Sequence, residues 1–118
     1  QNGYIVVENA FNVELGSSLL DLIKERIVFK KAGISKQTIY DNNARRDEIA
    51  WLDNKEFFQK KYLELMNDLR LALNEELYLG LSYYESHFAI YDEGDFYETH
   101  LDCFKNFKNR VVTTVYFL

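Results

Sequence analysis

The residues that decide the fold of this chain are ESHFAIYDEGDFYETHLDCF, residues 85–104, and RVVTTVYFL, residues 110–118. In the first stretch, apolar and aromatic residues alternate with polar ones on both sides of a turn at residues 93–95, a pattern typical of two strands joined by a turn. We predict these strands over residues 82–91 and 96–101. Residues 110–118 are the strongest strand candidate, because β-branched and aromatic side chains dominate them.

Two helices are predicted before these strands. Leucines and isoleucines recur at helical spacing over residues 18–30, which predicts a helix that begins at a serine. Asp53 is predicted to cap a longer helix over residues 53–76, because Glu56 stands three residues later and can complete a capping box.

Short strands are also predicted at residues 4–7 and 48–52, and the second contains Trp51, which we expect in the core. Helices followed by strands favour an α+β domain with a mainly β core. We expect helical support over about residues 1–80 and the first strands of the main sheet over about residues 81–118.

The composition excludes several classes of protein. A chain of 118 residues is expected to form one domain, over residues 1–118, and 47% hydrophobic residues suffice for a folded core. The net charge of −5 argues against nucleic acid as the main partner, because phosphate binding requires a basic surface. No apolar run approaches the roughly 18 residues of a membrane span, and the one cysteine, Cys103, cannot form an internal disulfide. We therefore expect a protein of a reducing compartment, the cytoplasm, with no membrane partner.

His100 and Asp102 are the residues most suggestive of chemistry. Residues two apart on a strand point to the same face, so an imidazole and a carboxylate would share one space. These are two of the three ligands of the 2-His-1-carboxylate site, which holds Fe(II) and leaves positions open for other ligands. The pattern by itself also fits a surface histidine hydrogen-bonded to a nearby acid, or a metal-dependent hydrolase that uses Zn(II).

The neighbouring residues narrow these possibilities. The chain resembles the prolyl-4-hydroxylase-like branch of the 2-oxoglutarate/Fe(II)-dependent dioxygenases in three separated segments. The matching pieces are Tyr91, Gly94, Phe96-Tyr97, His100, Asp102, Arg110 and the aromatic-Leu run at 116–118, together with RRDEIAWLD at 45–53 and NGYIVVENAF at 2–11.

This resemblance implies a double-stranded β-helix, or jelly roll, with supporting N-terminal helices, of which this chain would be the N-terminal portion. It implies Fe(II) as cofactor, 2-oxoglutarate and O2 as cosubstrates, and ascorbate as an optional reductant. His100 and Asp102 would be metal ligands, and Tyr91 and Tyr97 would line the 2-oxoglutarate pocket. The substrate-binding residues would be Asp47, at the edge of the site, and Arg110, at its mouth.

The implied reaction is hydroxylation of a C–H bond with conversion of 2-oxoglutarate to succinate. The implied substrate is a protein or peptide, hydroxylated at a prolyl or another side chain. The alternative is a non-catalytic binding or scaffold domain that keeps the dioxygenase fold with an incomplete metal site. Open sheet edges would then be available for pairing with another chain.

Two departures from the family pattern stand out. Phe117 stands where relatives place a tyrosine that reaches the distal carboxylate of 2-oxoglutarate. The family also has a second histidine ligand and a basic residue for 2-oxoglutarate downstream of the first two ligands. The only other histidine here is His87, which precedes His100 and which we expect to be a structural sheet residue. We therefore expect these 118 residues to be inactive on their own.

Overall fold

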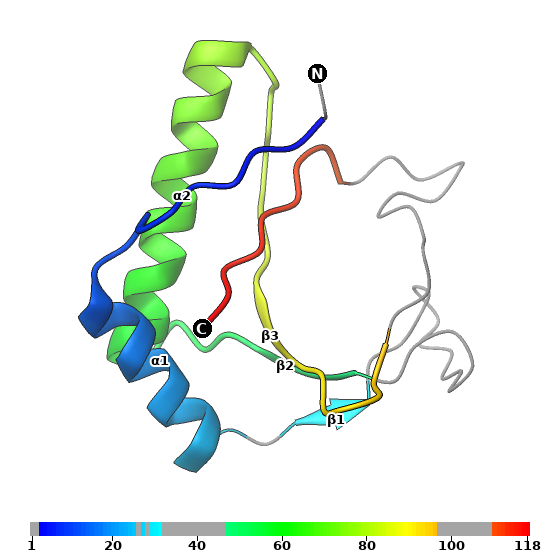
Figure 1. Ribbon diagram of the computed structural model, residues 1–118. Helices are drawn as coiled ribbons and strands as arrows, with labels where there is room; N and C mark the ends of the chain where they lie inside the picture. Colours follow the sequence, from blue (N-terminus) through cyan, green and yellow to red (C-terminus); the bar gives the residue numbers. More distant parts are fainter. Residues whose placement is uncertain (1–2, 26, 28, 32–46, 97–109) are drawn as a thin grey trace.

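The computed structural model describes residues 3–25, 27, 29–31, 47–96 and 110–118 (Figure 1). In chain order the elements are α1 (Val13–Glu25), β1 (Lys30–Lys31), β2 (Glu48–Trp51), α2 (Phe57–Leu77) and β3 (His87–Ile90). The two helices lie together on one side of the molecule and the strands lie on the other (Figure 1). The α+β class predicted from the sequence is confirmed for this part of the chain.

Helix α1 begins earlier than predicted. The side-chain oxygen Oδ1 of Asn12 accepts a hydrogen bond of 2.9 Å from the backbone N–H of Leu15 and thereby caps the helix. The predicted start at residue 18 is therefore wrong, because asparagine supplies the cap before either serine is reached. The helix buries Leu15, Leu19 and Leu22, which share one face at spacings of four and three residues.

The N-cap of helix α2 lies three residues later than predicted. Oε1 of Glu56 accepts from the backbone N–H of Gln59 at 2.9 Å, and Oε1 of Gln59 accepts from the backbone N–H of Asp53 at 2.7 Å. Asp53 instead directs its Oδ1 to the backbone N–H of Lys55, at 2.9 Å, in the turn before the helix. Glu56 is therefore the N-cap and Asp53 is not. No helix in the described ranges is both long and apolar enough to cross a membrane.

Polar side chains of α2 fix the chain that follows it. Arg70 Nη1 and Asn74 Nδ2 both donate to the carbonyl oxygen of Leu81, at 2.7 and 2.9 Å, and the Leu81 N–H donates to Asn74 Oδ1 at 2.6 Å. The Tyr84 hydroxyl donates to the carbonyl oxygen of Leu63 at 2.9 Å. The segment between α2 and β3 is thus held along the helix, and the strand predicted there is limited to β3.

The three strands form one antiparallel sheet in the order β1-β2-β3. A backbone hydrogen bond of 3.1 Å from the Leu52 N–H to the Ser86 oxygen continues the pairing of β2 with β3. The main core cluster consists of Phe88 from β3 and the three buried leucines of α1. Ile49 and Ala50 of β2 are buried as well, and the expectation of a mainly β core stays a prediction.

Two predicted strands do not form in the described part of the chain. Residues 4–7 are exposed, and neither they nor residues 110–118 belong to a strand. Residues 110–118 run toward the helices (Figure 1), where the Tyr116 ring lies 4.9 Å from Phe11 and 6.0 Å from Tyr62, centroid to centroid. This segment is anchored by side chains on the helices and forms no backbone ladder with the sheet.

The aromatic cluster around Tyr116 perturbs one titratable group. Burial raises the pKa of the Tyr62 phenol above its ordinary value of 10.0, a hydrogen bond with Thr114 lowers it, and the neighbouring Tyr116 raises it. The Thr114 hydroxyl also contacts the sulfur of Met66 at 3.7 Å. The cluster therefore favours the neutral form of Tyr62.

Candidate active site

The structure describes three of the six site residues that the sequence predicts. Asp47, Tyr91 and Arg110 are described, whereas Tyr97, His100 and Asp102 lie outside the described residues. The strand predicted at residues 96–101 falls almost entirely in the same undescribed stretch.

Asp47 and Tyr91 come together at one end of the β2–β3 pair. Glu48 lies opposite Ile90 in the antiparallel register, so Asp47 and Tyr91 are the next positions outward on the two strands. The Asp47 side chain is 1% exposed and that of Tyr91 is 48% exposed. No buried side-chain oxygen or nitrogen in the described ranges lacks a hydrogen-bond partner, so burial of this carboxylate leaves no unsatisfied polar atom.

The same side of the sheet continues through two further cross-strand pairs. Ile49 lies opposite Ala89, and Trp51 lies opposite His87 with ring centroids 5.2 Å apart in an edge-to-face arrangement. Residues opposite each other point to one face, and residues two apart share it. We call this surface the site face, and it consists of Asp47, Ile49, Trp51, His87, Ala89 and Tyr91.

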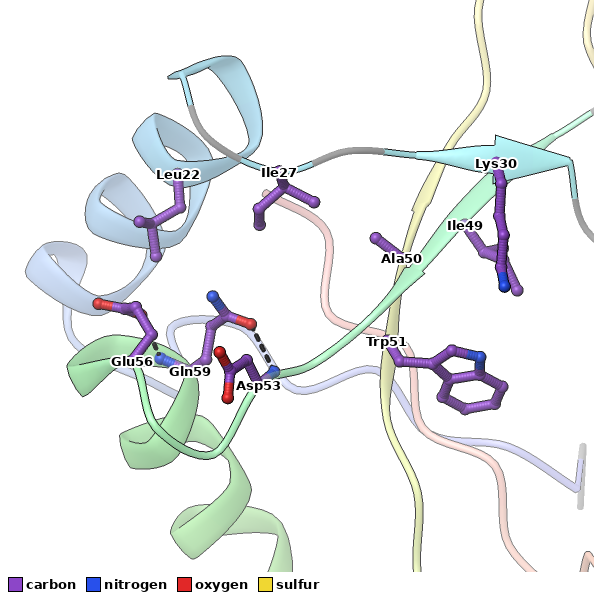
Figure 2. Close-up of a pocket in the computed structure, with 9 residues that line it drawn as sticks. All are labelled: Leu22, Ile27, Lys30, Ile49, Ala50, Trp51, Asp53, Glu56 and Gln59. Atoms are coloured by element: carbon purple, nitrogen blue, oxygen red, sulfur yellow. Dashed lines mark hydrogen bonds between the residues drawn. The ribbon is translucent and has the colours of Figure 1, made fainter.

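The other side of the sheet faces the helices. Phe88 is buried against α1, and Ala50, which lies opposite it, is also buried. In Figure 2 the Ala50 side chain points toward Leu22, whereas Trp51 points away from it. Trp51 is 50% exposed, so the expectation that it lies in the core is wrong. Its position in the alternation places it on the site face.

Some side chains of residues 110–118 contact the helices. Tyr116 packs against the core cluster that contains Phe88, and the Thr114 hydroxyl contacts Met66 of α2. Val115 and Phe117 are exposed, and Phe117 is 88% exposed.

The turn after Tyr91 forms as predicted. The Asp95 N–H donates to the Asp92 carbonyl oxygen at 2.8 Å, and the Asp92 N–H donates to Asp95 Oδ2 at 3.0 Å. Gly94 has a φ of 87°, a conformation that glycine adopts without strain. Arg110 is exposed, and its role on the substrate side stays a prediction.

A separate hollow of about 540 Å³ lies between the sheet and the helix starts (Figure 2). Its lining comprises Leu22, Ile27, Lys30, Ile49, Ala50, Trp51, Asp53, Glu56 and Gln59. Glu56 and Gln59 use their side-chain oxygens to cap α2, as the dashed lines in Figure 2 show. Neither Asp47 nor Tyr91 lines this hollow, so it is distinct from the end of the site face where the predicted residues meet.

Within the described ranges, no three histidine, cysteine, aspartate or glutamate side chains are grouped as a metal ion would require. The sequence did not identify Ile49, His87 or Ala89 as members of the site face. The period-two alternation of β2 and β3 was the available signal, but it needs the register between the two strands, which lie far apart in the sequence.

The chain is thus a two-helix layer against an antiparallel sheet whose outer face gathers an acid, a tyrosine and an indole–imidazole pair. The chain is similar to the crystal structure of a Pseudomonas putida prolyl-4-hydroxylase, with a TM-score of 0.69 and 34% sequence identity over 78% of this chain. The matched region is 50% of that enzyme, so the chain spans about half its length. No family model matches the chain, and no curated protein sequence matches it. The relationship to prolyl-4-hydroxylases indicated by the sequence motifs is thus supported by a solved structure.

Proposed function

We propose that this chain is one half of an Fe(II)- and 2-oxoglutarate-dependent dioxygenase that hydroxylates a prolyl or other protein side chain. The observation that carries the proposal is the similarity, in both sequence and structure, to a prolyl-4-hydroxylase over 78% of the chain. Because the chain spans about half of that enzyme, the activity is proposed for the complete polypeptide that carries this chain. The jelly-roll fold, with its first strands over about residues 81–118, is part of the proposal, and β3 is the strand that the described residues of this range form.

His100 and Asp102 are the proposed iron ligands. A neutral imidazole and a carboxylate are the donor types of the 2-His-1-carboxylate site, so the two residues fit Fe(II) chemically. When bound, the iron supplies the activation of O2 that C–H hydroxylation requires. The third ligand and the main cation for 2-oxoglutarate are assigned to the other half of the enzyme. Ascorbate as reductant and a reducing compartment, the cytoplasm, complete this proposal.

Four residues of this chain are proposed to bind and orient the reactants. The Tyr91 hydroxyl would donate a hydrogen bond to 2-oxoglutarate, and Tyr97 would form a wall of the same pocket. Asp47, opposite Tyr91, and Arg110 would flank the protein substrate. The close placement of Asp47 and Tyr91 supports the assignment of both residues to one site.

The test is anaerobic binding of Fe(II) and 2-oxoglutarate to the complete polypeptide. Binding is detected by the weak visible absorption band that 2-oxoglutarate produces when it binds iron. We expect the band in the unaltered protein and its loss in His100→Ala. Glu64→Ala, which changes an exposed residue of α2, is the matched control and should keep the band. A folded complete polypeptide without the band would refute the enzyme and leave a non-catalytic binding domain.

A further inference from the structure

Within the described residues, the edge of β2 that faces β1 is only partly paired. β1 begins at Lys30 and pairs with β2 at Glu48 and Ile49, so no described residue pairs with the two later positions of β2 on this side. On the other side, β3 pairs with all four residues of β2. The second half of β2 therefore has one neighbouring strand instead of two.

The backbone of Trp51 points to this open edge. The Leu52 N–H donates to the Ser86 oxygen, so these two residues form a hydrogen-bonded pair of the antiparallel ladder. Such pairs alternate with non-hydrogen-bonded ones, which makes Trp51 and His87 a non-hydrogen-bonded pair. Their ring contact agrees, because side chains lie closer in pairs of this kind. The N–H and the carbonyl oxygen of Trp51 therefore point away from β3, to the side that β1 leaves uncovered.

Gln59 occupies the next position along the same edge. Asp53 lies two residues beyond Trp51, and its N–H donates to Gln59 Oε1 at 2.7 Å, so a side-chain amide stands where the carbonyl of a paired strand would be. Gln59 is 6% exposed, and its Nε2 forms no hydrogen bond within the described residues. In Figure 2 this nitrogen points into the hollow between Leu22 and Ala50. A largely buried amide donor is thus available to a ligand in the hollow.

The lining of this hollow suits a neutral peptide group better than an ion. Its volume of about 540 Å³ is within the range of roughly 300–1,000 Å³ that is usual for binding pockets. The apolar part of the lining comprises Leu22, Ile27, Ile49 and Ala50. Lys30, Asp53 and Glu56 add charges of opposite sign, so an anion would meet two carboxylates and a cation would meet an ammonium group. A group that both donates and accepts without charge matches Trp51 and Gln59.

We propose that the open edge of β2 binds an extended peptide segment of another protein chain, with one residue of that segment opposite Trp51. The carbonyl oxygen of this residue accepts from the Trp51 N–H, and its N–H donates to the Trp51 carbonyl oxygen, as in an antiparallel ladder. Ile49 and Asp53, where the edge is already bonded, are roughly 13 Å apart at about 3.3 Å per residue, which leaves room for one such pair. Gln59 Nε2 donates to a carbonyl oxygen of the same segment.

Hydrogen exchange in the complete polypeptide, measured by nuclear magnetic resonance, tests the open edge directly. The Leu52 amide, which bonds to Ser86, should exchange slowly, and the Trp51 amide should exchange at least about tenfold faster. The probe is the neutral capped peptide acetyl-Ala-Val-Ala-amide, and the Trp51 amide should become more protected as its concentration rises. A Trp51 amide that is already protected without peptide would mean that the rest of the polypeptide covers this edge, and would overturn the inference.

Methylated peptides test for pairing as a strand. The Kd is followed by the chemical shift of the Leu52 amide. Methylation of the valine nitrogen removes the N–H that faces Trp51 and should raise the Kd by about tenfold, whereas methylation of the following alanine nitrogen, which points away, should change it by less than about twofold. Loss on the alanine alone would support the same pairing shifted by one residue. Equal loss on both nitrogens, or loss on neither, would refute pairing as a strand.

Three protein variants separate the backbone from the side chains. Trp51→Pro removes the N–H that β3 does not use and should abolish peptide binding, whereas its matched control Trp51→Ala keeps that N–H and should stay within about threefold of the unaltered Kd. Gln59→Glu keeps an oxygen for the Asp53 N–H, removes the amide donor and should raise the Kd by about threefold or more. Equal effects of Trp51→Pro and Trp51→Ala would show that the peptide contacts the indole and not the backbone, which would overturn the inference.

The outcomes are independent of the proposed function, because no measurement uses the iron site. Circular dichroism and the melting temperature show which variants are folded. Should Trp51→Pro fail to fold, amide exchange and the methylated peptides still decide the question. A protein that binds Fe(II) and 2-oxoglutarate but not the peptide keeps the proposed function and loses this inference, and the reverse result does the opposite.

Discussion

Replacement of Gly16 in α1 by alanine should change protein stability with a sign that depends on the Tyr116 hydroxyl. In an ordinary helix interior, glycine to alanine stabilises by about 0.5–1 kcal/mol. Here a Cβ atom at residue 16 would lie 2.7 Å from the Tyr116 hydroxyl oxygen, which is closer than carbon and oxygen pack. The ring cannot turn aside freely, because Phe11 and Tyr62 pack against it.

The contact distances give the expected magnitudes. Overpacking costs about 1–3 kcal/mol, which outweighs the gain in helix propensity, so Gly16→Ala should destabilise the protein by roughly 1 kcal/mol. In a Tyr116→Phe background the next atom is the ring Cζ, at 3.7 Å from the new Cβ, which is an ordinary contact. There Gly16→Ala should stabilise by about 0.5–1 kcal/mol.

The assay is urea unfolding of the four proteins of this cycle, followed by far-ultraviolet circular dichroism, with the free energies extrapolated to water. The cycle cancels any hydrogen bond that Tyr116→Phe removes by itself. Equal stabilisation by Gly16→Ala in both backgrounds would refute the packing of the Tyr116 hydroxyl on α1. That result would also argue against Tyr116 as the residue that holds residues 110–118 on the helices.

Three further changes test the fold around the site. Because burial raises the Tyr62 pKa, the contribution of Tyr62 to the free energy of unfolding should be constant below about pH 10, the unfolded-state pKa, and fall as the pH rises through the folded-state value. Tyr62→Phe should reduce this fall in urea unfolding at a series of pH values, and an unchanged profile would contradict the burial. Glu56→Ala removes the acceptor for the Gln59 N–H and should destabilise by about 1 kcal/mol, whereas a neutral effect would mean that the N-cap lies elsewhere. Asn74→Ala removes two hydrogen bonds to the Leu81 backbone and should cost about 1–3 kcal/mol. Hydrogen exchange at the Leu81 amide should accelerate in that variant, and unchanged protection would count against this tether.

The sequence predicted best the helices, strand and turn that depend only on residues close together in the chain. The existence of both helices, the strand at β2 and the turn at residues 93–95 follow from side-chain spacing and from glycine, so they could be predicted without tertiary contacts. Helix starts were less accurate, because several nearby residues can accept the same backbone N–H. Asn12 caps α1 although serine is an equally good cap in isolation, and Glu56 caps α2 although aspartate is the more common cap.

The candidate site illustrates what a sequence pattern leaves open. The motifs singled out Asp47 and Tyr91 separately, but only the register of β2 with β3 shows that the two residues are neighbours. His87 carried no motif signal, and Trp51 lay in the matched segment at 45–53 but was expected in the core. Their contact depends on the pairing of strands that long α2 separates in the sequence, and one residue of slippage would turn both to the other face.

The sequence by itself determined the α+β class, the helical periods and the likeness to prolyl-4-hydroxylases, because spacing and residue type are properties of short segments. Only the tertiary structure decided where residues 110–118 go, since alternation defines the two faces of a segment and not its neighbours. The Tyr116 side chain packs against Phe11 and Tyr62 and lies close to the backbone at Gly16, so it holds this segment on the helices. Phe117, the next residue, is 88% exposed, so tertiary contacts and not residue type decide which aromatic side chain of this segment is packed.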